Sequence, residues 1–258
     1  MMDWLLFGIF IFLMLTGVPL AVAMGLAGVA VVAVADLGMM SLPANVYTGI
    51  AKYPLMAIPV FVIAGLIFEK AGVAATIVRF ASALVGQRRG SLAIVAILVA
   101  MILGGISGSG PADSAAVGAV MLPLMLKAGY PRSFTAGVIA AAGSTDILIP
   151  PSIAFVIYSL LVPQASVPAL FAAGMIPGIL SGLTLILVAW WLSVRDNFEA
   201  EPAEPRPPFW QSLKEAGWGL AAPVIILGGM RSGFFTPTEA AVVAVFYGLL
   251  VGMVIYRT

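Results

Sequence analysis

Two short stretches of polar and helix-breaking residues interrupt a chain that is otherwise strongly apolar. The first covers residues 104–113 (GGISGSGPAD), and the second covers residues 143–152 (GSTDILIPPS). Hydroxyl, carboxylate and unpaired carbonyl oxygens are the ligands that hard cations prefer, and backbone N–H groups at a helix start suit a carboxylate anion. These stretches therefore predict binding sites for a small cation and for an organic anion.

In the first stretch, two interpretations of the acidic residue remain open. Ser109 or Gly110 is expected to cap a helix that begins at Pro111, where the missing N–H group costs nothing. Asp113 would then lie in the first turn, where the helix dipole favours a negative charge. However, a carboxylate at bilayer depth costs roughly 2.5–3.5 kcal/mol, and a serine would cap the helix as well. A bound Na⁺ would offset that cost, so Asp113 is either a structural cap or a cation ligand.

The second stretch follows the same logic around two prolines. Residues 143–146 would free carbonyl groups, and Pro150 and Pro151 would prevent the helix from resuming before Ser152. The N–H groups of the half-helix that starts there would point to the middle of the membrane. The alternative is a proline kink without a ligand, since transmembrane helices tolerate proline. Because each of the two breaks carries an Asp, we favour the binding interpretation.

Composition places the chain among all-α polytopic membrane proteins. It has 258 residues, of which 62% are hydrophobic and 9% charged, whereas soluble domains carry about 25% charged residues. The net charge of +1 argues against a nucleic-acid partner. The chain has no Cys and no His, which excludes disulfides, thiol chemistry and iron–sulfur clusters and removes the commonest transition-metal ligand.

Apolar runs predict the membrane helices that would position the two stretches. The expected elements are two short helices within 4–36 broken at 17–19, a loop over 37–53, a helix over 54–68, an amphipathic interfacial helix over 72–86, a hairpin over 91–127, a broken helix over 132–162, a span over 169–194, a polar linker over 195–208, and spans near 217–230 and 237–256. A spanning helix needs about 20 apolar residues. Each hairpin arm is shorter, which favours a re-entrant pair that enters and leaves on one side.

The positive charges predict an orientation and a domain organisation. If the loops on both sides of the hairpin are cytoplasmic, every Lys and Arg except Lys52 and Arg231 lies inside. An odd number of crossings in 1–195 would then make the following segment an inverted repeat. The expected parts are scaffold-type helices over 1–70, an amphipathic arm helix over 71–90, a transport region with the hairpin and broken helix over 91–165, a span and cytoplasmic linker over 166–216, and the start of an incomplete second repeat over 217–258.

Other polar residues are expected to have structural roles. Thr236, Pro237 and Glu239 have the spacing of a capping box, so we expect them to begin a helix rather than to bind a substrate. Lys52 and Arg231 are expected to be solvated charges in loops, which contribute little energy.

At these motifs the chain resembles the large membrane subunit of tripartite ATP-independent periplasmic (TRAP) transporters, the DctM-like family. The resemblance runs through most of the sequence and includes PLMAIPVFVIAGLIFEKAG at 54–72, GGISGSGPADSAAVGAVMLPLMLKAGYPRSF at 104–134, ILIPPSIAFVIYS at 147–159, LFAAGMIPG at 170–178 and GFFTPTEAAV at 233–242. It implies an elevator-type, Na⁺-coupled importer of organic acids in the bacterial inner membrane, not an enzyme. It also implies two partners, a small four-helix membrane subunit and a periplasmic substrate-binding protein.

The resemblance also implies the residues of the site, with Na⁺ as coupling ion and no organic cofactor. The cation ligands would come from the hairpin and the broken helix, namely Ser107, Ser109, Asp113, Gly143, Thr145, Asp146 and Pro150. Ser107 and Ser152 would bind the substrate carboxylate. Related sequences usually have Gly in place of Asp146, which could strengthen the cation site or weaken it by repulsion from Asp113. Family members are also longer, so the chain is expected to be a fragment that holds the first repeat.

Three alternative functions are weighed against Na⁺-coupled transport. In a proton-coupled carrier of the same fold, Asp113 and Asp146 would titrate instead of binding Na⁺. In an intramembrane protease, Ser107 would be the nucleophile of a GxSG motif at 105–108, but that chemistry needs a general base, typically a His that this chain lacks. An aspartyl dyad remains formally open for the protease. A non-transporting membrane scaffold would leave both polar stretches dispensable.

Overall fold

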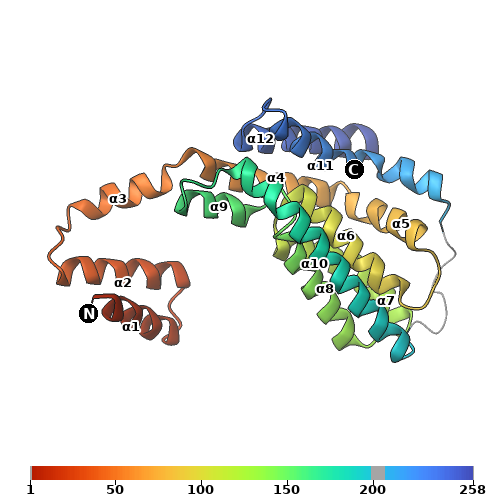
Figure 1. Cartoon of the computed structure of the whole chain (residues 1–258), viewed down its shortest axis with the longest axis horizontal. Helices are drawn as coiled ribbons and strands as arrows, with labels where there is room; N and C mark the ends of the chain where they lie inside the picture. Colours follow the sequence, from red (N-terminus) through yellow and green to blue (C-terminus); the bar gives the residue numbers. More distant parts are fainter. Residues whose placement is uncertain (1, 199–206, 258) are drawn as a thin grey trace. The chain divides into compact units, whose positions relative to one another are not determined.

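The computed structural model describes residues 2–198 and 207–257 and is all-helical over that part of the chain, without strands. The chain divides into two compact units, Met1–Lys52 (unit 1) and Tyr53–Thr258 (unit 2), which can be followed by colour in Figure 1. The predicted all-α class is therefore confirmed. The polar stretches that carry the candidate chemistry both lie in unit 2.

Unit 1 contains three helices, α1 (Met2–Leu15), α2 (Leu20–Val34) and α3 (Ser41–Ile50). The expected break between the first two is confirmed, since α1 and α2 are separated by a turn that contains Gly17 and ends at Pro19. The prediction of a loop over 37–53 is wrong, because α3 occupies most of it. Its apolar residues recur with helical spacing at Leu42, Val46 and Ile50. Pro43 does not prevent this helix, because N–H groups of a first turn need no partner within the helix.

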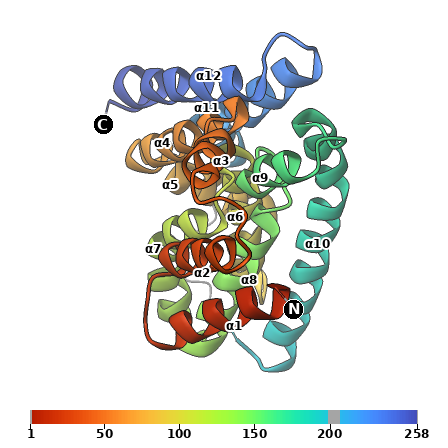
Figure 2. The ribbon, with the colours of Figure 1, turned by 90° about the vertical axis from the view of Figure 1, so that its left-hand side faces the viewer.

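Unit 2 begins with a 3₁₀ turn, η1 (Tyr53–Met56), and ends with a π-helical turn, η2 (Val251–Tyr256). The helices between them are α4 (Ala57–Lys70), α5 (Val73–Val85), α6 (Ser91–Ser107), α7 (Gly110–Lys127), α8 (Arg132–Asp146), α9 (Ile153–Leu161), α10 (Val167–Arg195), α11 (Phe209–Arg231) and α12 (Pro237–Leu250). Helices α6, α7 and α8 pack on one another, with α10 along α6 and α8 (Figure 1). At the other end of the unit, α12 packs on α4 and α11 packs on α5 (Figure 2).

Helix α6 is the centre of this arrangement because it is apolar on every side. Its buried residues include Val95, Ile97 and Val99, which lie in the main hydrophobic cluster of the unit. A helix without a polar face must be covered all round. Here α5, α7, α8 and α10 provide that cover, so α6 holds the tip of the hairpin inside the unit.

Three helical segments of the described residues are long and apolar enough to cross a bilayer, namely 53–70, 167–195 and 237–256. Helices α1, α2, α5 and α6 are apolar but shorter. The predicted span near 217–230 corresponds to α11, which is not one of the three. Helix α11 begins at Phe209 directly after Pro208, before the start of the predicted span, and Lys214 and Glu215 make its first turns polar. Part of the predicted linker, 199–206, lies outside the described residues.

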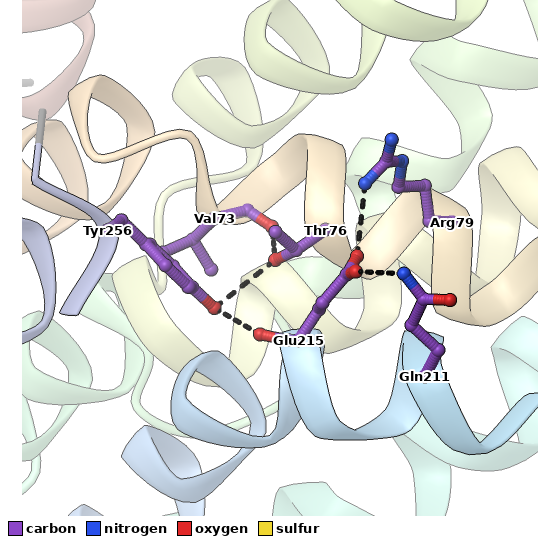
Figure 3. Close-up of polar contacts among 6 residues, drawn as sticks. All are labelled: Val73, Thr76, Arg79, Gln211, Glu215 and Tyr256. Carbon is purple, nitrogen blue, oxygen red and sulfur yellow. Dashed lines mark hydrogen bonds and ion pairs between the residues drawn. The ribbon is translucent and has the colours of Figure 1, made fainter.

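Side-chain bonds tie α5, α11 and the C-terminal turn together (Figure 3). Arg79 of α5 donates to Glu215 of α11 over 3.0 Å, and Gln211 donates to the other carboxylate oxygen of Glu215, also over 3.0 Å. Tyr256 of η2 donates its hydroxyl to the main-chain carbonyl of Glu215. The interfacial position expected for 72–86 stays a prediction, but this helix also buries Val73 and Ile77 in the main hydrophobic cluster of the unit.

Helix α12 begins with the expected capping box. The hydroxyl of Thr236 accepts a hydrogen bond from the N–H group of Glu239 over 3.4 Å, and the Glu239 carboxylate accepts from the N–H group of Thr236 over 2.8 Å. The motif therefore satisfies two N–H groups that a helix start leaves unpaired. Its structural interpretation is confirmed.

Candidate functional site

The tip of the hairpin is a two-residue turn between α6 and α7. Gly108 adopts a left-handed conformation with φ of +64°, and Ser109 is extended. Helix α7 then begins at Gly110, one residue before the predicted Pro111, and Pro111 lies in its first turn. The Ser109 side chain makes no capping hydrogen bond. The turn thus depends on glycine at position 108, because a side chain is disfavoured at positive φ.

Ser107 and Asp113 meet across this tip. The Ser107 hydroxyl lies 2.7 Å from both carboxylate oxygens of Asp113, and it accepts a hydrogen bond from the N–H group of Ser109 over 3.1 Å. Asp113 is only 5% exposed. The carboxylate therefore reaches back to the end of α6 instead of capping α7 with its side chain. The arrangement gathers hydroxyl and carboxylate oxygens of residues 107 and 113 at one buried point.

The second interruption lies between α8 and α9. It starts at Ile147 and not at Gly143 as predicted, because residues 143–146 form the last turn of α8. Two hydroxyls of that turn bond back to their own helix, Ser144 to the Ala141 carbonyl over 2.6 Å and Thr145 to the Ala142 carbonyl over 2.7 Å. When Ser and Thr lie inside a helix, a carbonyl of the preceding turn is a common partner for their hydroxyl groups. The prolines at 150 and 151, which cannot donate, are what delays the next helix until Ile153.

Ser152 caps α9 as the sequence suggested. Its hydroxyl accepts from the N–H group of Phe155 over 3.4 Å and donates to the Ile147 carbonyl over 2.6 Å. The residue is 1% exposed. Ser152 thus closes the turn after α8 and also starts α9, so its side chain is held in place from both sides.

The two interruptions meet in space. The N–H group of Ile153 donates to the carbonyl of Gly108 over 3.3 Å, which joins the start of α9 to the tip of the hairpin. A methyl group on Gly108 would overlap the carbonyl oxygen of Pro151. Backbones that approach this closely require residues without side chains.

Further glycines bring the same elements together. A methyl group on Gly104 would lie 2.7 Å from Cβ of Asp146, and one on Gly110 would overlap the carbonyl oxygen of Gly143. The carbonyl oxygen of Pro150 lies 3.8 Å from the position that a methyl group on Gly105 would take. The structure therefore gathers the expected cation and substrate residues of the hairpin and of the second interruption in one region of unit 2.

Asp146 is the residue in this region whose bonding is incomplete. It is fully buried, and its Oδ1 lies 3.5 Å from the Thr145 hydroxyl. Its Oδ2 has no hydrogen-bond partner in the described part of the chain. The negative charge of Asp113 acts on it as well. A buried carboxylate oxygen without a partner is costly, and either a bound cation or a proton on the carboxyl group would remove that cost.

The donors present fit a monovalent cation held by mixed oxygen ligands. Hydroxyls come from Ser107 and Thr145, carboxylates from Asp113 and Asp146, and main-chain carbonyls from the last turn of α8. The described residues contain no group of three or more Asp, Glu, His or Cys side chains able to hold a metal ion together. The two carboxylates and the neutral hydroxyl and carbonyl oxygens are the ligand types that a small, hard cation prefers.

Sequence reasoning missed the contribution of α4. A cavity of about 40 Å³ beside the hairpin tip is lined by Ser107, Ser109 and Asp113, and on its other side by Gly65 and Glu69 of α4. A methyl group on Gly65 would lie 2.7 Å from Cβ of Ser107, so α4 passes directly against the tip. The available signal was the i, i+4 spacing of Gly65 and Glu69 in a helix that is apolar up to Phe68.

These features define an all-helical membrane protein with a polar site built where two helix interruptions meet. Comparison with known proteins identifies its family. The family of the tripartite ATP-independent periplasmic transporter, DctM component, matches residues 7–258, and the chain belongs to this family. The resemblance inferred from the motifs is confirmed. The family is one of transporters and not of enzymes, which excludes the protease alternative for Ser107.

Relatives with assigned names cover nearly the whole chain. It is 41% identical over 255 residues to the C4-dicarboxylate TRAP transporter large permease protein DctM of Vibrio cholerae. The match covers 98% of the chain and 56% of that protein. It is 42% identical over 242 residues to the 2,3-diketo-L-gulonate TRAP transporter large permease protein YiaN of Escherichia coli, or 93% of the chain and 57% of that protein. It is 39% identical over 254 residues to the isethionate TRAP transporter permease protein DctMQ of Oleidesulfovibrio alaskensis, and the match covers 98% of the chain and 40% of that protein. The chain thus spans about half the length of these relatives.

Proposed function

We propose that the chain forms part of the large membrane subunit of a secondary transporter that imports small organic anions together with Na⁺. The observation that carries the proposal is the meeting of the two interruptions around Asp146, whose carboxylate oxygen lacks a partner. A site that brings two carboxylates together without a described Lys or Arg beside them favours a bound cation. Na⁺ would be held by oxygens of Ser107, Ser109, Asp113, Gly143, Thr145, Asp146 and Pro150.

Asp146 is best interpreted as a strengthening ligand of this site. Repulsion between Asp113 and Asp146 destabilises the site without a cation, and this repulsion disappears when a cation lies between the two negative charges. An unpaired buried charge is costly by several kcal/mol. The second carboxylate should therefore raise Na⁺ affinity while lowering the stability of the Na⁺-free protein.

The anion would bind where two helix starts converge. Helix α7 begins at Gly110 and α9 at Ile153, and the bond from Ile153 to Gly108 places these starts next to each other. Helix N-termini carry partial positive charge and unpaired N–H groups, which favour carboxylates. Ser107 is the last residue of α6, directly before the hairpin tip, and Ser152 directly precedes α9. The names of the relatives refer to small organic anions, which agrees with such a site.

The membrane arrangement we propose follows from helix lengths. Helices α6 and α7 contain 17 and 18 residues, so each is about 26 or 27 Å long at 1.5 Å per residue, which is shorter than the roughly 30 Å hydrocarbon layer. We propose that they form a re-entrant hairpin in an elevator-type transport region of a bacterial inner-membrane protein. The second inverted repeat, a small membrane subunit and a periplasmic binding protein would complete the transporter.

Uptake into proteoliposomes tests the proposed function. The complete transporter, with the binding protein supplied outside, should accumulate radiolabelled succinate when an inward Na⁺ gradient is imposed at fixed pH, and choline in place of Na⁺ should abolish uptake. Ser107→Ala should reduce uptake at least about tenfold, because it removes the hydroxyl that both Asp113 oxygens contact. The matched control is Ser144→Ala, which removes an exposed hydroxyl bonded only within α8.

The outcomes separate the alternatives. Uptake that persists in choline and follows a pH gradient would establish the proton-coupled carrier in place of Na⁺ coupling. Unchanged uptake by Ser107→Ala would contradict the assignment of the hairpin tip as part of the site and would favour the scaffold interpretation of these stretches.

A further inference from the structure

Glu69 occupies a position that neither helix electrostatics nor ion pairing explains. It lies in the last turn of α4, which ends at Lys70, and the helix dipole disfavours a negative charge there. In the described part of the chain, no Lys or Arg forms an ion pair with it. The acidic side chain of Glu69 therefore does not stabilise α4, and its surroundings are the place to look for its role.

The side chain of Glu69 faces the hairpin tip. Gly65, one turn earlier on α4, touches Ser107, and residues four apart share one face of a helix. Helical side chains lean toward the N-terminus of their helix, so Glu69 covers the turn that contains Gly65. Accordingly, Glu69 lines the same 40 Å³ cavity as Asp113 and Ser109, and its charge acts on Asp113.

The cavity is large enough for a small cation and connects the two acids. A volume of about 10–15 Å³ already holds one water-sized body, so a 40 Å³ space admits an ion with room to move. Its remaining walls are mainly apolar side chains of α4 and α6, such as Leu66, Leu103 and Ile106. Between low-dielectric walls, a charge at the opening acts over a longer distance than in water.

We infer that Glu69 is the acidic residue at the mouth of the cation site, where it attracts Na⁺ into the cavity and toward Asp113. This inference rests on the proposed Na⁺ site and adds to it a residue on α4. Because the Glu69 side chain is exposed, its inferred role is a long-range attraction of the ion and not direct ligation. With the orientation expected from the positive charges, this mouth opens toward the cytoplasmic side.

Direct Na⁺ binding by the 258-residue chain tests the inference. The purified chain in lipid nanodiscs is titrated with ²²Na⁺, with choline chloride at about 10 mM and then at about 300 mM. Glu69→Gln should weaken Na⁺ binding about threefold to tenfold at low salt, and the difference should shrink at high salt because screening removes a long-range attraction. Glu69→Asp, which keeps the charge, should bind Na⁺ nearly as well as the wild type.

A neighbouring variant and a stability measurement complete the design. Lys70→Gln changes a charge at the adjacent position that does not line the cavity, and it should change Na⁺ binding by less than about twofold. Glu69→Gln should keep the thermal stability of the wild type in Na⁺-free buffer, which separates lost attraction from misfolding.

Three results would overturn the inference. Wild-type binding by Glu69→Gln would remove Glu69 from the site while leaving the proposed Na⁺ site intact. Equal weakening by Glu69→Asp and Glu69→Gln would show that side-chain length and not charge matters. Absence of saturable Na⁺ binding by the wild-type chain would overturn both the inference and the proposed Na⁺ coupling.

Discussion

Replacing Gly108 with alanine should separate the two interruptions. Gly108 has positive φ, and a methyl group there would overlap the carbonyl oxygen of Pro151. Both obstacles involve main-chain atoms, so no rotation of a side chain can relieve them. The variant can be accommodated only if the hairpin tip and the turn before α9 move apart.

The size of the effect follows from these two contacts. A residue other than glycine in the left-handed region costs roughly 1–2 kcal/mol. Separation would also break the bond from the Ile153 N–H group to the Gly108 carbonyl, which contributes about 0.5–1.5 kcal/mol. Together these costs come to about 1.5–3.5 kcal/mol. At roughly 2–4 °C per kcal/mol for a chain of this size, the apparent Tm should fall by about 3–14 °C.

Thermal unfolding in detergent, followed by intrinsic tryptophan fluorescence, measures this change, and ²²Na⁺ binding measures its consequence for the site. The matched control is Gly137→Ala in α8, where a methyl group would meet no atom within 4 Å. That variant should keep or slightly raise the Tm, because alanine favours helix over glycine by about 0.8–1.0 kcal/mol. If Gly108→Ala kept both the Tm and Na⁺ binding of the wild type, the close approach of the two interruptions would be refuted.

Three further variants test separate parts of the account. Asp146→Asn should raise the Tm in Na⁺-free buffer by a few degrees, since it removes an unpaired buried charge, and should reduce the additional stabilisation by Na⁺; a fall in Tm without Na⁺ would contradict this reasoning. Tyr256→Phe removes the hydroxyl bonded to the Glu215 carbonyl and should lower the free energy of unfolding by about 0.5–1.5 kcal/mol, measured by chemical denaturation in detergent, whereas an unchanged value would mean that this bond does not hold the C-terminal turn. Thr236→Ala removes the cap of α12 and should cost about 1 kcal/mol in the same measurement, and a neutral result would argue against a stabilising capping box.

The features that sequence reasoning predicted correctly are those with strong local signals. The interruption predicted over residues 104–113 is present but is shorter, since only Gly108 and Ser109 lie outside helices α6 and α7, and Pro150 and Pro151 marked the place where helix could not continue. Thr236 preceded Pro and Glu at capping-box spacing. In each case the conformation depends on a few adjacent residues, so the printed sequence contains the necessary information.

The features that were missed depend on packing or on competing local bonds. Residues 41–50 were expected to be part of a loop, although the apolar spacing of α3 is helical. Residues 143–146 were expected to unwind, but the hydroxyls of Ser144 and Thr145 bond to their own helix. Glu69 was missed because its i, i+4 spacing from Gly65 is a weak signal, and only the tertiary contact of α4 with the hairpin places it at the cavity.

The central claim is that the hairpin tip and the end of α8 form one cation site, and a double-mutant cycle on ²²Na⁺ binding tests it most directly. Ser107→Ala alters the tip, Thr145→Val alters the end of α8 with nearly the same side-chain shape, and the double variant combines them. We expect saturable binding by the wild type, weaker binding by each single variant, and a coupling of at least about 0.5 kcal/mol in the double variant, because both hydroxyls would serve the same ion. Strictly additive effects, or no saturable binding at all, would contradict the claim.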